Sequence, residues 1–408
     1  MNYIILVGIA LFFFATAIRD GAMGWHFDGG SMNFRISTAD YTLGVRGDGQ
    51  IDLAPDGSGV AALDEGGSLD VRMTRGRTER RARFEGVNGA VERQFFVGGD
   101  EQPWGPDADA FVTEVMPVVL RETGISAEQR VAWLIENRGH EGLLDEIGLI
   151  NSDFAQRVYT VQYASTAMIA DADFLRLMTL AGDRMGSDFD LRTTLTEVHD
   201  LEMPTGDQFV ALLGAGRTLG SDFDARTLLE HVGPRMPSTP EAAAAYFGLA
   251  GTIGSDFDIR LALQPLVTRA DGSDELVAGA IEMAGTEIGS DFDLRVLLAE
   301  AAPRVGASDL LARAYTTAAR SIGSDFDHRE ALTALGDRAN LTPAGWRLLL
   351  ESARSIGSDF DCATLLVAIA PKLPRDADVL AAYRETVATI GSDHDRDRAT
   401  TALVEIAL

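Results

Sequence analysis

A six-residue motif recurs along this 408-residue chain: an aliphatic residue followed by Gly-Ser-Asp-Phe-Asp, with a few substitutions. Its serine occurs eight times, at Ser152, Ser187, Ser221, Ser255, Ser290, Ser324, Ser358 and Ser392. Successive serines are 34 or 35 residues apart, a period typical of solenoids, in which each unit is a helical hairpin that buries its apolar face against its neighbours. The motif therefore predicts a mainly α protein, with an α-solenoid of about eight hairpins over residues 151–408.

The motif also predicts a tight corner between two helices. In the third copy, Gly220 is placed to end one helix in the left-handed conformation, and Ser221 is placed to cap the next helix. Asp222 and Asp224 follow in the first turn, where the helix dipole favours negative charge. We expect almost no loop at these corners.

The aromatic residue of the motif predicts packing between units. It is Phe154, Phe189, Phe223, Phe257, Phe292, Phe326 and Phe360, and becomes His394 in the last copy. We expect these phenylalanines to form a core between neighbouring hairpins rather than a cofactor site. Changes gathered in the end copies are expected of solenoid caps, which face water on one side.

The paired aspartates allow two interpretations. Stacked units would place their carboxylates along one edge, and oxygen-rich arrays of this kind bind calcium. However, Arg157, Arg192, Arg226, Arg260, Arg295 and Arg329 each follow the first aspartate by four residues, within reach on the same helix face. The favoured prediction is an arginine ladder that neutralises the carboxylates and bridges adjoining units, with no metal and no cofactor.

The N-terminus contains an unbroken apolar run from Tyr3 to Ile18. As a helix it would span about 24 Å, short of a hydrocarbon core of about 30 Å. A retained anchor over residues 1–23 is the favoured interpretation, which predicts a bacterial inner-membrane protein with its extrinsic part on the periplasmic side. A cleaved signal peptide, with Ala15 and Ala17 near the cleavage site, and a soluble core helix are the alternatives.

Residues 24–105 predict a small antiparallel β domain. Short alternating runs at Asn33–Ser37, Tyr41–Val45, Ile51–Leu53, Ser68–Met73, Arg80–Phe84 and Val91–Val97 are separated by glycine-containing turns. Two of these strands carry a basic patch made of Arg72, Arg75, Arg77, Arg80, Arg81 and Arg83. The patch is either a solvated outer face, partly paired with Glu79, Glu85 and Glu92, or a contact for anionic lipid headgroups or an acidic partner.

Residues 106–150 predict a helical entry cap. A periodic apolar pattern covers Ala108–Glu122, and Ser126 with Gln129 predicts a capping box for the next helix. The single cysteine, Cys362, excludes an intrachain disulfide, and the net charge of −27 argues against binding nucleic acid.

With these residues considered together, the helical part resembles HEAT-like repeat solenoids, in which aspartate and arginine form ladders between corners. The layout over residues 30–408 resembles the extramembrane tail of bacterial sensor proteins of the membrane zinc-metallopeptidase type. This resemblance implies a membrane-tethered interaction module. The peptidase part is absent, since no His-Glu-x-x-His occurs among the six histidines.

The expected function is accordingly non-enzymatic. Neither Gly-x-Ser-x-Gly nor a phosphate-binding loop occurs, and Cys362 has no matched base. The favoured prediction is a membrane-anchored accessory subunit whose solenoid holds a larger membrane complex, with protein subunits and membrane lipid as partners. A photosynthetic reaction centre or a respiratory complex is one concrete case. The alternative is a sensor or adaptor that binds a soluble protein or peptide in the solenoid groove.

Overall fold

The computed structural model describes residues 24–28, 31–166, 168–338 and 340–407. They form two compact units, of which the first ends at Gln162 and the second begins at Tyr163. The predicted anchor, Tyr3–Ile18, lies outside the described residues. Within the described residues, no helix is both long enough and apolar enough to cross a membrane.

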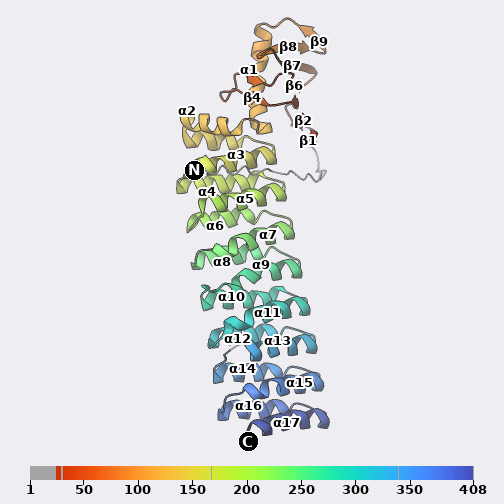
Figure 1. The fold of residues 1–408 in the computed structure, drawn as a ribbon, viewed down its shortest axis with the longest axis vertical. Helices are drawn as coiled ribbons and strands as arrows, with labels where there is room; N and C mark the ends of the chain where they lie inside the picture. Colours follow the sequence, from red (N-terminus) through yellow and green to blue (C-terminus); the bar gives the residue numbers. More distant parts are fainter. Residues whose placement is uncertain (1–23, 29–30, 167, 339, 408) are drawn as a thin grey trace. The chain divides into compact units, whose positions relative to one another are not determined.

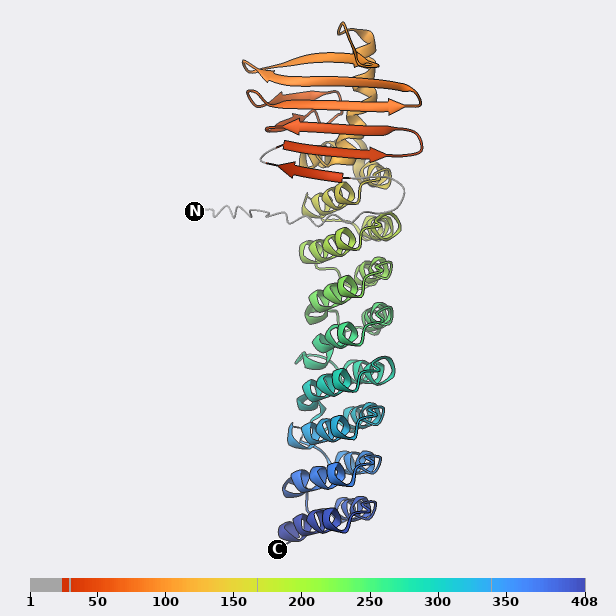
Figure 2. The same ribbon diagram turned by 90° about the vertical axis from the view of Figure 1, so that its right-hand side faces the viewer.

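The first unit contains an antiparallel sheet whose strands lie side by side in Figure 2 in the order β1-β2-β3-β6-β7-β8-β9. Its strands are β1 Gly24–Asp28, β2 Ser31–Ser37, β3 Thr42–Asp48, β6 Ser68–Arg75, β7 Thr78–Val87, β8 Ala90–Val97 and β9 Asp100–Gln102. A separate two-stranded hairpin is formed by β4 Ile51–Leu53 and β5 Val60–Leu63, in the connection between β3 and β6. The sheet is therefore a meander with one inserted hairpin.

All six predicted strands are present, at β2, β3, β4, β6, β7 and β8, and the antiparallel prediction is confirmed. The strands β1, β5 and β9 were not predicted. The strands β5 and β9 are only four and three residues long, and neither shows the alternation of buried and exposed positions that marks a strand in sequence.

One face of the sheet is covered by α1, Pro106–Thr123. Alternate residues of each strand point toward the helix, so that Val45 on β3 and Val71 on β6 are fully buried. Phe111 and Met116 supply the helix side of the same core. The opposite face of the sheet carries the polar half of the alternation.

The entry cap is helical as predicted, with α1 followed by α2, Ala127–Gly148. The prediction of a capping box at Ser126 was wrong, because the Ser126 side chain makes no cap hydrogen bond. Ser126 has a left-handed backbone, with φ 54°, and its hydroxyl accepts a hydrogen bond from the Leu53 amide at 3.1 Å. Ser126 therefore ties α2 to the β4–β5 hairpin instead of capping its own helix.

Eight helices begin at the first aspartate of the eight motifs, which confirms the repeat pattern. They are α3 Asp153–Thr166, α5 Asp188–Glu202, α7 Asp222–Val232, α9 Asp256–Thr268, α11 Asp291–Val305, α13 Asp325–Arg338, α15 Asp359–Ile369 and α17 Asp393–Ala407. They alternate with α4 Asp171–Arg184, α6 Asp207–Gly216, α8 Pro240–Ala250, α10 Asp274–Glu287, α12 Asp309–Ala319, α14 Pro343–Ala353 and α16 Ala377–Val387. Short 3-10 turns, η1 Gly233–Arg235 and η2 Ala370–Lys372, follow α7 and α15.

In the second unit, the even-numbered and odd-numbered helices form two columns (Figure 1). Most helices pack mainly on the one two positions further along the chain, as α4 does on α6 and α11 does on α13, whereas the contact between α8 and α10 is small. Buried tyrosines also link the two columns: the Tyr246 hydroxyl on α8 donates to the Ala262 carbonyl at 2.6 Å, and that of Tyr315 on α12 donates to the Ala331 carbonyl at 2.8 Å. These bonds satisfy the hydroxyls inside an apolar core.

Candidate functional site

The corners of the solenoid are capped by the motif serines, as predicted. In the third copy, the Ser221 hydroxyl accepts a hydrogen bond from the Asp224 amide at 3.2 Å. The prediction for the preceding glycines was wrong, because neither Gly220 nor its counterparts at 254, 289, 323, 357 and 391 have a positive φ. The glycines contribute in another way.

Each corner glycine from Gly220 onward donates its amide to the first aspartate of the preceding unit. The six donor–acceptor pairs are Gly220–Asp188, Gly254–Asp222, Gly289–Asp256, Gly323–Asp291, Gly357–Asp325 and Gly391–Asp359, with nitrogen–oxygen distances of 2.8–3.2 Å. Asp291 and Asp359 accept a second amide each, from Ser324 and Ser392. The first aspartate therefore caps the next corner as well as lying in its own helix.

The motif arginine makes a second connection between units. Its Nε lies 2.7–2.9 Å from the second aspartate of the following unit, in the pairs Arg192–Asp224, Arg226–Asp258, Arg260–Asp293, Arg295–Asp327 and Arg329–Asp361. These side chains are all less than a quarter exposed. The predicted bridging between units is confirmed, and the amide bonds and ion pairs together form an aspartate–arginine ladder.

The first corner uses a different acceptor. Glu122, at the end of α1, is fully buried and accepts hydrogen bonds from the amides of Asn151 at 3.0 Å and Ser152 at 3.1 Å. Burial raises the pKa of Glu122, while the Asn151 side chain and these amides oppose that rise. Glu122 thus takes the place of the motif aspartate that a preceding unit would supply.

The six phenylalanines at positions 189, 223, 257, 292, 326 and 360 do not form a core, and that prediction was wrong. Each of these phenylalanines is 52–60% exposed, and they occupy equivalent positions in six successive units. They stand at the second residue of the odd-numbered helices α5 to α15. We call this row of exposed rings the phenylalanine ladder.

Arginine guanidinium groups lie against these rings. The carbon at the centre of the guanidinium lies 4.8–5.2 Å from the ring centroid in the pairs Arg192–Phe189, Arg226–Phe223, Arg260–Phe257, Arg295–Phe292 and Arg329–Phe326. At Phe360 the partner is Arg398, at 5.4 Å. In the first five pairs the arginine is itself held by the next unit's aspartate, so that each ring rests on a fixed base. The outer part of each ring is available to a partner.

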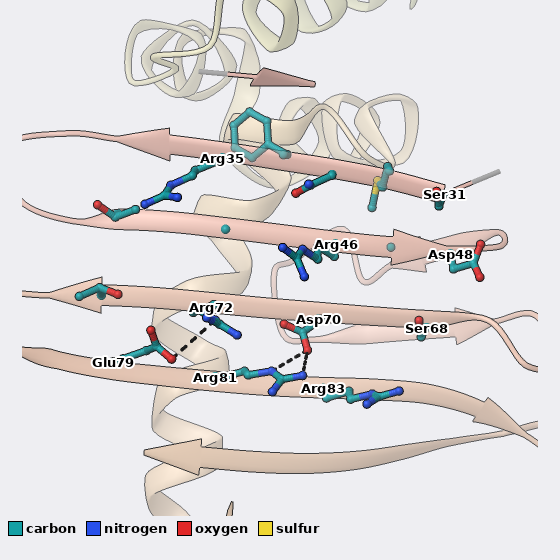
Figure 3. A pocket seen from close by; sticks show the side chains of 17 residues that line it. Ser31, Arg35, Arg46, Asp48, Ser68, Asp70, Arg72, Glu79, Arg81 and Arg83 are labelled. Atoms are coloured by element: carbon teal, nitrogen blue, oxygen red, sulfur yellow. Dashed lines mark hydrogen bonds and ion pairs between the residues drawn. The ribbon is translucent and has the colours of Figure 1, made fainter. Parts of the chain in front are cut away.

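The first unit offers a second surface, the open face of the sheet (Figure 3). It forms a hollow of about 610 Å³ lined by five arginines, at positions 35, 46, 72, 81 and 83, and by the carboxylates of Asp48, Asp70 and Glu79. Two of its ion pairs are drawn in Figure 3, from Arg72 to Glu79 and from Arg81 to Asp70. The excess of arginine allows this face to bind an anionic group.

The predicted basic patch is divided between two surfaces. Arg72, Arg81 and Arg83 lie on the open face. Arg75 and Arg80 instead pair with Glu114 of α1, with nitrogen–oxygen distances of 3.0 and 2.6 Å.

The remaining member, Arg77, lies exposed in the turn between β6 and β7. The predicted partners Glu79 and Glu85 are used, by Arg72 and Arg83 respectively. The solvated, paired interpretation therefore holds for much of the patch.

Two further arginines on the open face, Arg35 and Arg46, were missed. They are the arginines of that face for which the described residues provide no ion-pair partner. Arg35 and Arg72 are the cross-strand neighbours of Gly44, on β2 and β6, and no atom lies within 4 Å of the place where a Cβ of Gly44 would be. The surface above Gly44 is therefore open, with Arg35 and Arg72 on the two neighbouring strands.

Comparisons of the chain with protein-family models, with curated proteins and with solved structures found no match. Function is therefore argued from the geometry of this chain alone.

Proposed function

We propose that the protein is a non-enzymatic accessory subunit that holds together a larger membrane protein assembly, with the phenylalanine ladder as its protein-binding surface. The observation that carries the proposal is the exposure of six equivalent rings, each more than half accessible, along six successive units. Large exposed apolar rows are rare on monomers and mark interaction sites. Core positions in a solenoid would have been the ordinary place for these side chains.

The ladder has the composition and the rigidity of a binding surface. Aromatic and arginine side chains are enriched at the energetic centres of interfaces. Because each guanidinium of Arg192 to Arg329 is already fixed by an aspartate, the ring beside it loses little freedom on binding. The regular spacing favours a partner that contacts several units at once.

The first unit provides the membrane side of the proposal. The predicted anchor run precedes the sheet directly in the chain, and Arg35 and Arg46 offer unpaired positive charge on its open face. Anionic lipid headgroups attract such charges by about 1 kcal/mol for each arginine near the surface. We propose that this face contacts the headgroups when the chain is anchored.

The decisive experiment changes the ladder while leaving the fold intact. A variant with Phe223, Phe257 and Phe292 replaced by serine should fold, because these rings are half exposed, but should no longer co-purify with the assembly from native membranes. The control replaces Leu175 and Leu310, exposed apolar residues outside the ladder, by serine. Retention of the assembly by the triple variant would refute the ladder as the binding surface.

Two further measurements separate the roles of the two units. Deletion of residues 1–20 should release a folded, helix-rich protein that no longer joins its assembly. Replacement of Arg35 and Arg46 by glutamine should weaken sedimentation with vesicles containing phosphatidylserine, most clearly at low salt. If the truncated protein still binds its partner in solution through the ladder, the adaptor interpretation replaces the accessory-subunit one.

A further inference from the structure

Two histidines and an aspartate meet between adjacent units of the solenoid. His199 and Asp200 lie in the last turn of α5, and His231 lies in the last turn of α7. One side-chain ligand atom from each residue lies within 4.8 Å of the other two. In the part of the chain that the structure describes, this is the one such group of three.

The spacing suits a small ion with nitrogen and oxygen ligands. His231 Nε2 lies 2.9 Å from Asp200 Oδ1, and His199 Nδ1 lies 3.7 Å from the same oxygen. Zinc with ligands at about 2.1 Å in a tetrahedron requires ligand atoms about 3.4 Å apart. Small rotations of Asp200 and His231, which are both partly exposed, would bring all three atoms to that distance.

The buried histidine provides a second, independent indication. The side chain of His199 is 3% exposed, and its Nδ1, which faces Asp200, has no hydrogen-bond partner among the residues that the structure describes. A buried ring nitrogen left unpaired is costly, since such groups in folded proteins are nearly always bonded. A metal ion at the centre of the three residues would satisfy it.

The three residues also lie at the carboxyl ends of α5 and α7, where the helix dipole favours a cation.

The Arg235 guanidinium supplies a positive charge beside these three residues. Its Nη2 pairs with Asp200 Oδ1 and lies 3.0 Å from His231 Nε2. The side chain of Arg235 is 43% exposed, so the guanidinium can turn into solvent. Exposed ion pairs of this kind are weak because water screens the charges, so a metal–ligand bond can displace this one.

We propose that His199, Asp200 and His231 bind one divalent transition-metal ion of the zinc class, which clamps α5 to α7. Two imidazoles and one carboxylate are a known zinc ligand set that leaves a fourth position open for water or for a partner's side chain. Calcium is not expected here, because it requires six to eight oxygen ligands.

The test uses the full-length chain, purified without a histidine tag. Zinc should bind with a stoichiometry of one and raise the melting temperature. Cobalt(II) should bind at the same site and give the intense visible absorption of a four-coordinate complex. Absence of stoichiometric binding at micromolar zinc would overturn the proposal.

Variants locate the ion and separate binding from folding. Asp200→Asn and His231→Gln, both at partly exposed positions, should each weaken zinc binding at least about tenfold, comparable to or beyond the loss seen for outer-shell changes. Arg235→Gln should tighten binding, because it removes the competing cation, an effect that a purely structural arginine would not have.

The matched control is His394→Gln, at the last corner, which should leave binding unchanged. Zinc affinity that survives both Asp200→Asn and His231→Gln would place the ion elsewhere and refute the assignment. Unchanged or weaker binding by Arg235→Gln would refute the role given to Arg235 as the resident cation.

Discussion

The connection between units can be tested most directly at Asp291. Its carboxylate accepts two amides of the next corner, from Gly323 and Ser324, each at 2.8 Å. Replacement by alanine removes both acceptors. Hydrogen bonds to a charged group contribute about 1.5–3 kcal/mol each. Because the corner is partly exposed and water replaces part of the bond, we expect a total loss of about 2–3 kcal/mol.

Hydrogen exchange measures this loss where it occurs. Solenoids unfold unit by unit, so a single global transition would average the effect away. A local loss of 2–3 kcal/mol should accelerate exchange of the Gly323 and Ser324 amides by about 30- to 150-fold, since each 1.4 kcal/mol is a factor of ten. Peptide-resolved mass spectrometry after deuterium labelling gives this ratio directly.

Two comparisons make the result specific. Asp291→Asn keeps one side-chain oxygen as an acceptor and should lose about half as much. Asp274→Ala removes a first-turn aspartate of α10 that makes no bond to another unit within the described part of the chain, and should cost only the dipole contribution of about 0.3–1 kcal/mol. If Asp291→Ala and Asp274→Ala changed exchange equally, the aspartate would act only within its own helix, and the reasoning would be wrong.

Three further outcomes follow from burial. Phe292→Ala should lower the local stability of its unit by only about 1 kcal/mol, through lost contact with Arg295, whereas a fully buried phenylalanine would cost about 3–5 kcal/mol. A loss in the higher range, measured by hydrogen exchange of the α11 amides, would restore the core interpretation. Burial lowers the pKa of His328 to about 4, below its unfolded value of about 6.5. The neutral His328 ring therefore contributes its full share to folding stability above pH 6.5. This stability is lost at about 1.4 kcal/mol per pH unit as the pH falls toward 4. His328→Asn should reduce the slope of stability between pH 6.5 and 5, and an unchanged slope would contradict this. Burial raises the pKa of the Cys362 thiol to about 11, so it should react with a disulfide reagent only after unfolding, and prompt reaction in the native protein would show that the site opens.

The repeat predicted the fold because its period and its caps are local. Ser221, with Asp222 and Asp224, specifies a helix start without reference to the rest of the chain. Because the caps are local signals, the sequence predicted only part of the aspartate–arginine ladder, whose bonds join separate units. The aspartate–glycine and arginine–aspartate partners are 32 or 33 residues apart, and which aspartate of the next unit lies opposite depends on the offset between stacked helices.

The position of the phenylalanines could have been predicted from the helical pattern. On α7 the buried apolar residues are Ala225, Leu228, Leu229 and Val232, which form one stripe because each lies three or four residues from another member. Phe223 is two residues before Ala225, which places it on another face of the helix. Its neighbours three and four residues later, Arg226 and Thr227, are polar. The residue type of this recurring aromatic favours a core position, whereas its phase in the helical pattern predicts exposure.

The prediction of the basic patch on the sheet was incomplete for a different reason. Alternation along β7 already separates Arg80 from Arg81 and Arg83, so the division of the patch was readable in sequence. The contribution of Arg35 and Arg46 was not, because it requires β3 to pair with β6 across the inserted hairpin. The His199–Asp200–His231 group likewise depends on the stacking of two units, and the spacing of these residues in the sequence matches no metal-binding motif.

In the aspartate–arginine ladder, all bonds between units run in the same direction along the chain. In each one, a carboxylate or guanidinium of one unit bonds to the unit that follows it. The two ends therefore differ chemically, and a stack with unlike ends is able in principle to join copies head to tail without closing. Asp393 of the last motif is 93% exposed and pairs with Arg396 of its own helix, at 2.9 Å, where its counterparts bond to the next corner. The amides of the first corner, at Asn151 and Ser152, donate to Glu122. Because Glu122 already accepts these two amides, they are not free to donate to a carboxylate of another copy, which disfavours end-to-end joining at this corner.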